Sequence, residues 1–264
     1  MCPITFHYTL RMSKLTFNLI FIFLITSTLS VFAQSSGKLY ELRVYHCNDG
    51  KRDDLVKRFN DHTVALFERH GFENIGYWIP TDPAMKNDLI YIVAFPDMAA
   101  HDASWKGFLD DPDWKAAFQA SRVNGPLVAS IDSKFLYLED DLTKTIKSKQ
   151  ASPERLFELR TYDCYPNKYP NLVKRFEENT CKLLKKHGME NIAYFGTTGK
   201  DANPQPQLVY IVAHKNAAAA EQSWKDFNEN PKWLAAKENS TKDGKIVEKI
   251  TSVFMTPTSF SKIK

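Results

Sequence analysis

The chain has 264 residues, of which 43% are hydrophobic and 25% charged, and its formal net charge is +4. This length allows one large domain or two of ordinary size, and the composition excludes a disordered or collagen-like chain. The charge is too close to neutral to indicate binding to nucleic acid or to an anionic membrane surface.

The first element is an apolar segment, residues 15–32, which follows Arg11 and Lys14 and ends at Val31-Phe32-Ala33. A basic flank, an apolar stretch and small residues before the cleavage point are typical of a secretory signal peptide. We therefore expect residues 1–33 to be a signal peptide cleaved after Ala33, and the mature protein to be secreted or periplasmic without stable membrane insertion. A membrane anchor is the alternative, because about 18 apolar residues can just span a bilayer.

The next element is a strand at 40–47, and its pattern of Glu, Leu, Arg, Tyr and Cys returns 117 positions later at 157–164. Alternation with a period of two places Leu42 and Val44 on one face of this strand. The other face carries charged and phenolic side chains, which are Glu41, Arg43 and Tyr45 in the first copy and Glu158, Arg160 and Tyr162 in the second.

The elements that follow also occur twice and in the same order. A helix with an apolar stripe ends at a glycine, two strands come next, and then two helices and a last strand. In the first copy the helix runs from Leu55 to His70, the strands are at 73–79, 89–95 and 133–138, and the later helices carry Trp105 and Trp114. In the second copy the helix runs from Leu172 to His187, the strands are at 190–195, 208–214 and 252–255, and the later helices carry Trp224 and Trp233.

Each copy therefore follows the split βαβ plan, an antiparallel sheet with helices on one face. We predict an α+β protein made of two tandem ferredoxin-like repeats, at 38–139 and 155–258, joined by a polar linker at 140–154. The bare faces of the two sheets would cover each other as a pseudo-dimeric α+β barrel. A homo-oligomer of this chain is also possible.

In such a barrel we expect the polar strand face to look inward and to line a ligand pocket. The candidate ligand-binding residues are Glu41, Arg43, Tyr45, Tyr77, Tyr91, Glu158, Arg160, Tyr162, Tyr194 and Tyr210. Arginine and tyrosine suit an anionic or phenolic small molecule. The alternative is a structural ion-pair network, because buried charges persist only when they are paired.

The repeated pattern resembles the NIPSNAP family. The residues that carry the resemblance are the strand start Tyr40–Tyr45, the turn glycine Gly50, His70-Gly71, the pair Tyr77-Trp78 and the helix with Trp105. The resemblance implies a dimeric α+β-barrel fold and no agreed catalytic residues. Animal members of the family are linked to mitochondria and to vesicle or autophagy functions, a role that the secretory signal argues against. The second copy departs from the pattern with Asn167 at the turn and Ala193 in place of Gly76.

Other chemistry has little support in the sequence. There is no catalytic-serine, phosphate-loop or zinc motif, so we expect no metal and no cofactor, with haem ligation by His62, His70 or His187 as a remote alternative. Cys47 and Cys164 occupy equivalent strand ends, and a bridge between them is conceivable. Two functions remain open: a small-molecule-binding or interaction module, and a cofactor-independent enzyme, monooxygenase- or isomerase-like, acting on a small polar or aromatic molecule.

Overall fold

The computed structural model describes residues 37–143, 146, 155–197 and 206–264. The expected signal peptide and most of the expected linker lie outside the described residues. None of the helices in the described part of the chain is long and apolar enough to cross a membrane.

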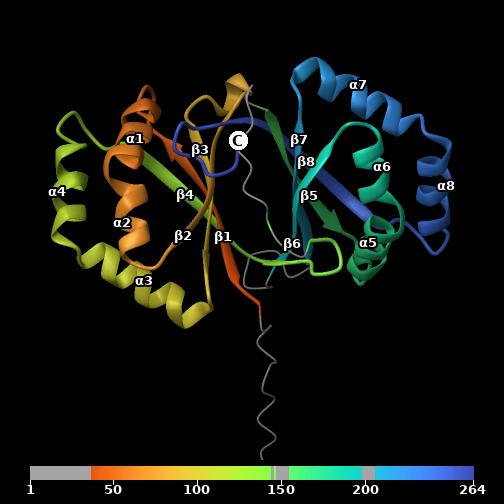
Figure 1. Cartoon of the computed structure of the whole chain (residues 1–264), viewed down its shortest axis with the longest axis horizontal. Helices are drawn as coiled ribbons and strands as arrows, with labels where there is room; N and C mark the ends of the chain where they lie inside the picture. Colours follow the sequence, from red (N-terminus) through yellow and green to blue (C-terminus); the bar gives the residue numbers. More distant parts are fainter. Residues whose placement is uncertain (1–36, 144–145, 147–154, 198–205) are drawn as a thin grey trace, which may run out of the picture. The chain divides into compact units, whose positions relative to one another are not determined.

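Apart from η2, which has no counterpart in the described part of the second repeat, both repeats contain the same series of elements (Figure 1). The first comprises β1 (Leu39–Cys47), α1 (Arg52–Arg58), η1 (Phe59–Thr63), α2 (Val64–Arg69), β2 (Glu73–Pro80), η2 (Pro83–Met85), β3 (Asp88–Phe95), α3 (Met98–Asp110), α4 (Pro112–Ala120) and β4 (Val128–Leu138). The second comprises β5 (Leu156–Cys164), α5 (Tyr169–Arg175), η3 (Phe176–Thr180), α6 (Cys181–Lys186), β6 (Glu190–Thr197), β7 (Gln207–His214), α7 (Ala217–Asn228), α8 (Pro231–Ser240) and β8 (Val247–Pro257).

The eight strands form one closed barrel in the order β1-β3-β2-β8-β5-β7-β6-β4, so the predicted fold class is confirmed. The two repeats are joined by two short antiparallel pairings. In one, Trp78 of β2 lies opposite Pro257 of β8, and in the other Leu138 of β4 lies opposite Phe195 of β6. Closure leaves neither repeat with an unpaired edge strand at these joints.

The apolar face of each sheet looks into the barrel. One core cluster contains Leu42 and Ile92 of the first repeat together with Leu159 and Ile211 of the second. Aromatic rings also meet across the repeats: the centroids of Tyr40 and Phe195 are 5.2 Å apart. Two further clusters, one in each repeat, fill the space between the sheet and its own helices.

The prediction that the polar face of the first strand looks into the barrel is wrong. Tyr45, Tyr77 and Tyr91 belong to the cluster beneath the helices of the first repeat, on the outer side of the sheet. The physical reason is that Glu41 and Glu158 find their partners within their own repeats, so neither of these carboxylates has to be matched across the interior. The interior can then be packed with Leu, Ile and Val, which carry no desolvation penalty.

The last strand of each repeat is longer than predicted. β4 begins at Val128 and β8 at Val247, five residues before the expected start in each case. The first halves of both strands are largely exposed, and they therefore lack the apolar alternation that marks a half-buried strand.

The two departures of the second repeat keep the same backbone. Asn167 adopts a left-handed conformation with φ of 62°, close to the 72° of Gly50, and asparagine tolerates this region better than most residues. A Cβ atom on Gly76 would come within 2.2 Å of the Trp78 ring. The second repeat has Phe195 at the position of Trp78, and this smaller ring leaves room for Ala193.

The long helix of each repeat contains one π turn, η1 or η3, directly after an arginine. Thr63 Oγ1 donates a hydrogen bond of 3.3 Å to the carbonyl of Arg58, and Thr180 Oγ1 donates one of 3.2 Å to the carbonyl of Arg175. The threonines thus satisfy carbonyl oxygens at the wide turn, where the regular α-helical bonding is interrupted.

The three cysteines in the described part of the chain, Cys47, Cys164 and Cys181, are free thiols. Cys47 and Cys164 lie in the two separate sheet–helix clusters, so the conceived bridge between them is absent. Burial raises the pKa of the Cys47 thiol to about 11 and that of Cys164 to about 12.

Candidate functional site

The first polar centre is the carboxylate of Glu41 on β1, which is 2% exposed. It accepts hydrogen bonds from Ser133 Oγ at 2.6 Å and Trp105 Nε1 at 3.0 Å, and from the guanidinium of Arg43. His101 Nε2 lies 3.3 Å from Oε2 of Glu41, the oxygen that also accepts from Trp105. Burial opposes ionisation, but the contacts with His101, Arg43 and Ser133 outweigh it and lower the pKa of Glu41 to about 2.

Glu158 on β5 has the same surroundings. It accepts from Arg160 at 2.5 Å, Ser252 Oγ at 2.6 Å and Trp224 Nε1 at 2.7 Å, and His214 Nε2 lies 2.9 Å away. Burial is again outweighed, so the pKa of Glu158 is lowered to about 2. Both carboxylates are therefore ionised and saturated with donors. This arrangement matches a structural ion-pair network, the alternative to a ligand pocket.

The arginine of each pair also packs on aromatic rings. The guanidinium of Arg43 lies 4.6 Å from the centroid of Trp105 and that of Arg160 lies 4.2 Å from Trp224, distances typical of cation–π contacts. Together with the ion pair, this contact holds Arg43 and Arg160 in place.

The tyrosines predicted as ligand-binding residues come together in each repeat, but deep in its core. Tyr77 stacks on Tyr91 at 5.3 Å, and Tyr194 stacks on Tyr210 at 5.2 Å. These four are at most 1% exposed, so they do not form the wall of an open pocket. The Tyr210 hydroxyl donates to Tyr162 at 3.2 Å, whereas the Tyr91 hydroxyl has no hydrogen-bond partner among the described residues.

A second arginine in each repeat was missed by the sequence reasoning. Arg58 is 5% exposed and stacks on Trp114 at 5.0 Å, and Arg175 is 6% exposed and stacks on Trp233 at 5.3 Å. Each makes one side-chain hydrogen bond, to Ser121 Oγ or to Ser240 Oγ. Within the described residues neither has an ion-pair partner, and both Nε atoms lack an acceptor.

These unpaired cations face open grooves outside the barrel. A groove of about 360 Å³ is lined by Arg58, Phe118, Arg122, Pro126, Leu127, Val128, Ala129, Ser130 and Ile131. A groove of about 540 Å³ is lined by Asn171, Lys174, Arg175, Glu178, Asn179, Lys232, Ala235, Ala236, Asn239, Ser240 and Asp243. A buried cation without a counter-ion is costly, so an anion that enters either groove would meet a prepared partner.

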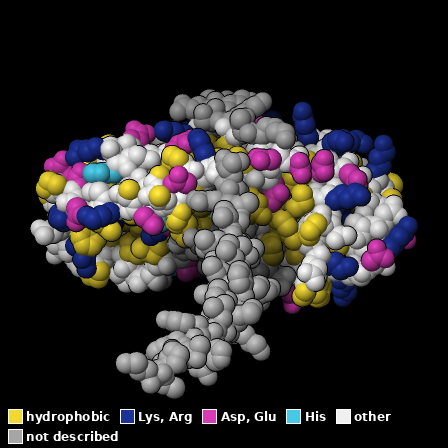
Figure 2. All heavy atoms as spheres, turned by 90° about the horizontal axis from the view of Figure 1, so that it is seen from below, with side chains coloured by type: hydrophobic (Ala, Val, Ile, Leu, Met, Phe, Trp, Pro, Cys, Tyr) yellow, Lys and Arg dark blue, Asp and Glu magenta, His cyan; other side chains and the backbone are white. Residues whose placement is uncertain are grey.

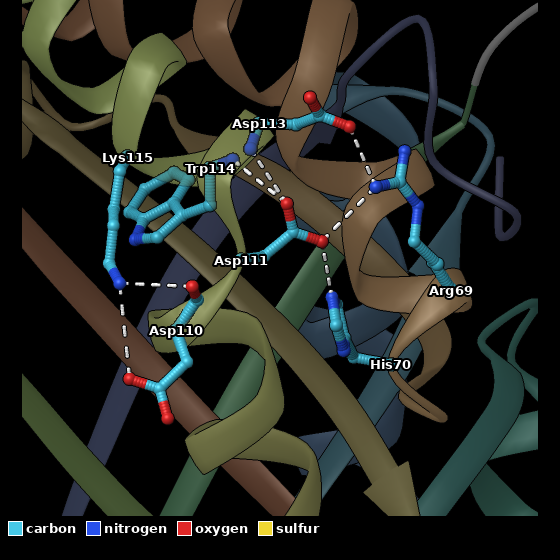
Figure 3. A network of polar contacts seen from close by, with 7 residues as sticks. All are labelled: Arg69, His70, Asp110, Asp111, Asp113, Trp114 and Lys115. Carbon is cyan, nitrogen blue, oxygen red and sulfur yellow. Dashed lines mark hydrogen bonds and ion pairs between the residues drawn. The ribbon is translucent and has the colours of Figure 1, made fainter.

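The histidines at the helix ends have a structural role. Figure 3 shows His70 and Arg69 pointing at Asp111, the residue that caps α4. His70 Nε2 lies 2.6 Å from Asp111 Oδ2, and this contact is the largest of those that lower the pKa of Asp111 to about 2. In the second repeat His187 makes the corresponding contact with Asn230 at 2.9 Å.

Haem ligation by these histidines has no support in this geometry. His70 and His187 are both engaged by the cap residues of α4 and α8, and His62 is exposed. No group of three or more metal-ligating side chains occurs in the described ranges.

Polar side chains on the inner face of the barrel gather at one end. Lys134, which lies beside Leu42 in the register, hydrogen-bonds Gln207 of the other repeat, and Gln207 also bonds Asp163. His46 lies 2.9 Å from Asp88 at the same end of β1. These groups pair with one another at this end of the barrel.

Two stretches of the chain, residues 40–141 and 157–262, match the NIPSNAP family model, and they correspond to the two repeats of the barrel. The chain belongs to the NIPSNAP family. A search of curated proteins finds no match.

Solved structures that are similar to this chain span either about half of it or most of it. A NIPSNAP family protein of unknown function from Agrobacterium tumefaciens str. C58 is 22% identical, with a TM-score of 0.37, covering 44% of this chain and 98% of its own. A candidate monooxygenase from Lactobacillus acidophilus NCFM is 14% identical, with a TM-score of 0.55, covering 84% and 94%. An anthrone oxidase-like protein is 8% identical, with a TM-score of 0.58, covering 87% and 95%. The last two show a shared fold.

One sequence signal could have revealed the second arginine of each NIPSNAP repeat. Lys57-Arg58-Phe59 recurs as Lys174-Arg175-Phe176, inside the apolar stripe of the helix. A charged residue between two buried positions, kept in both copies, indicates a buried side chain with a specific partner.

Proposed function

We propose that this NIPSNAP protein binds a small organic anion with an apolar body, such as an aromatic carboxylate, in the groove beside Arg58. The observation that carries the proposal is the guanidinium of Arg58, buried at 5% exposure with no ion-pair partner in the described part of the chain. This binding site lies between the helices and the strand start of β4, outside the barrel interior.

The composition of the groove supports an amphipathic ligand. Arg58 and Arg122 supply two positive charges, and no acidic side chain lines the groove. Phe118, Leu127 and Ile131 offer an apolar wall, and Ile131 is 43% exposed. An anionic head would pair with the arginines while the body of the ligand covers this wall.

Isothermal titration calorimetry with 1-naphthoate tests the proposal, with neutral 1-naphthamide as the matched ligand. We expect the carboxylate to bind and the amide to bind much more weakly. Arg58→Met should weaken naphthoate binding by about tenfold to hundredfold, as expected for a charge-assisted hydrogen bond. Lys57→Met removes the same charge from the exposed neighbouring position and should leave the affinity unchanged.

A second variant keeps the test valid if Arg58→Met does not fold. Arg122 lines the same groove on the exposed side, and Arg122→Gln should lower the affinity without touching the core. Equal binding of the acid and the amide, or unchanged affinity in both arginine variants, would contradict the proposal.

We also propose that the protein is exported, on the basis of the basic flank, the apolar segment and the Val31-Phe32-Ala33 boundary. The mature protein isolated from its source should begin at Gln34 by N-terminal sequencing. Recovery of residues 15–32 in a soluble cytosolic form would contradict export.

The second candidate function is a cofactor-independent enzyme, an oxygenase or an isomerase. It is favoured by the fold that the chain shares with an anthrone oxidase-like protein and a candidate monooxygenase. Oxygen uptake with an anthrone would establish this function over simple binding.

A further inference from the structure

The groove between α5 and α8 in the second repeat differs in charge from the same place in the first repeat. It contains Arg175, which is 6% exposed and has no ion-pair partner in the described ranges, although acidic side chains also line the groove. Lys232 adds a second positive charge on its walls, and Lys174 adds a third, although Lys174 Nζ lies 3.8 Å from Glu178 Oε1. The question is whether this set of residues forms a site of its own.

Comparison of the repeats isolates the features particular to this groove. Asp54 and Asp113 occupy the positions on α1 and α4 that Asn171 and Lys232 occupy on α5 and α8. Two acidic side chains of the first repeat are thus replaced by an amide and a cation around an unchanged buried arginine. At these two positions the helix pair of the second repeat is therefore more positive than that of the first.

The charge of the whole second repeat supports this local change. Residues 38–139 contain 12 Lys and Arg against 16 Asp and Glu, whereas residues 155–258 contain 16 against 12. Figure 2 shows Lys and Arg side chains gathered more densely over the right-hand half of the molecule, the side of α5–α8 in Figure 1. An anion approaching the second repeat is therefore attracted over a longer range than one approaching the first.

The other lining groups indicate what else the ligand carries. Asn171, Asn179 and Asn239 line the groove, and amide side chains both donate and accept hydrogen bonds. Ser240 Oγ already donates to the Lys237 carbonyl and accepts from Arg175. Such a set suits hydroxyl groups better than it suits an apolar body, in contrast to the groove beside Arg58.

We propose that the α5–α8 groove is a second binding site, selective for a phosphorylated polyhydroxy compound such as a sugar phosphate. Arg175, with Lys174 and Lys232, binds the phosphate, and the three asparagines bind hydroxyl groups. Glu178 and Asp243 on the same walls limit the net positive charge, which favours a ligand that also offers hydroxyl groups over a bare polyanion.

Calorimetric titration of the mature protein with glucose 6-phosphate, inorganic phosphate and glucose tests the site. We expect glucose 6-phosphate to bind more tightly than either of the other two. Arg175→Met should weaken its binding by about tenfold to hundredfold. Lys182→Met, an exposed cation on the neighbouring helix α6, should have no effect.

Asn171→Asp serves as the second variant if Arg175→Met does not fold. It restores the acidic residue of the first repeat at an exposed position on the groove and should also weaken binding. Equal affinities for phosphate and glucose 6-phosphate, or unchanged affinity in both variants, would overturn the proposal. This outcome is independent of the naphthoate titration, which depends on Arg58 in the other repeat.

Discussion

His101 on α3 places its Nε2 atom 3.3 Å from Oε2 of Glu41 on β1. In the second repeat Glu158 is contacted by His214, which lies on strand β7. His214 occupies the position of Phe95 in the first repeat, and Ala220 occupies that of His101. The two copies therefore bring an imidazole to the same carboxylate from different elements.

This difference between the repeats predicts that stability depends on the contact between an imidazole and the carboxylate, more than on the element that supplies the imidazole. His101→Ala should lower the free energy of unfolding by about 1–3 kcal/mol, because the buried carboxylate of Glu41 loses an ion-pair partner. Adding Phe95→His recreates the arrangement of the second repeat and should recover part of the loss. Urea denaturation measures both variants, and a double variant less stable than His101→Ala would contradict this interpretation.

The contact also predicts a dependence on alkaline pH. Burial opposes protonation of His101, but Glu41 and Asp102 outweigh it and raise its pKa above the ordinary 6.5. A raised pKa in the folded state adds stability that is fully present below pH 6.5 and is lost as the pH rises through the folded-state value. The thermal midpoint of His101→Ala should therefore fall less between pH 6 and pH 9 than that of the unchanged protein.

The ion pair of Arg43 with Glu41 predicts a strong effect on stability. Arg43→Met leaves the Glu41 carboxylate buried with fewer partners, which should cost about 3–5 kcal/mol. Glu41→Gln combined with Arg43→Met should recover part of this loss, because no unpaired charge remains. Arg160→Met should cost the same, since its surroundings are equivalent, and denaturation in urea compares the three variants.

Asp111 predicts a difference between the repeats at acid pH. Its pKa, about 2, lies below the ordinary 3.8, so it contributes stability that is present above pH 3.8 and is lost as the pH falls through 2. Asp111→Asn copies the Asn230 of the second repeat and should remove this part of the acid dependence. Asn230→Asp is the reciprocal variant and should increase it. Thermal midpoints between pH 2 and pH 6 measure both.

The buried thiols give a chemical test of the fold. Because burial raises the pKa of Cys47 and Cys164, a protein beginning at Gln34 should react slowly with a thiol reagent at pH 8 when folded. Three thiols should react once it is unfolded without a reductant, since Cys181 is also free. A total of one would indicate a disulfide.

The repeat was the reason that the fold could be predicted from the sequence. Two copies of one pattern fix the order of the elements, and two half-covered sheets have few ways to bury their bare faces. The alternation in β1 separates Leu42 from Arg43 but does not say which of the two faces the helices cover. The face that the helices cover depends on Trp105 and His101, which are distant in sequence from Glu41. The prediction for this face was wrong.

The candidate site was predicted only in part. The sequence correctly predicted which strand residues lie together. In the structure Arg43 donates a hydrogen bond to Glu41, and Tyr77 stacks on Tyr91. The grooves could not be found, because they depend on how α4 and α8 lie against the helices that carry Arg58 and Arg175.

The π turns also determine the direction in which Arg58 and Arg175 point. A π turn contains one residue more than an α turn, so it offsets the two ends of the helix by about 100°. Deleting one residue from Phe59–Thr63 would restore a regular α-helix. The deletion would also rotate either Arg58 or the apolar stripe of α2 away from the sheet. The length of this turn, more than the identity of its residues, therefore keeps the cation at the groove, and a length change here should be far more damaging than any exposed substitution.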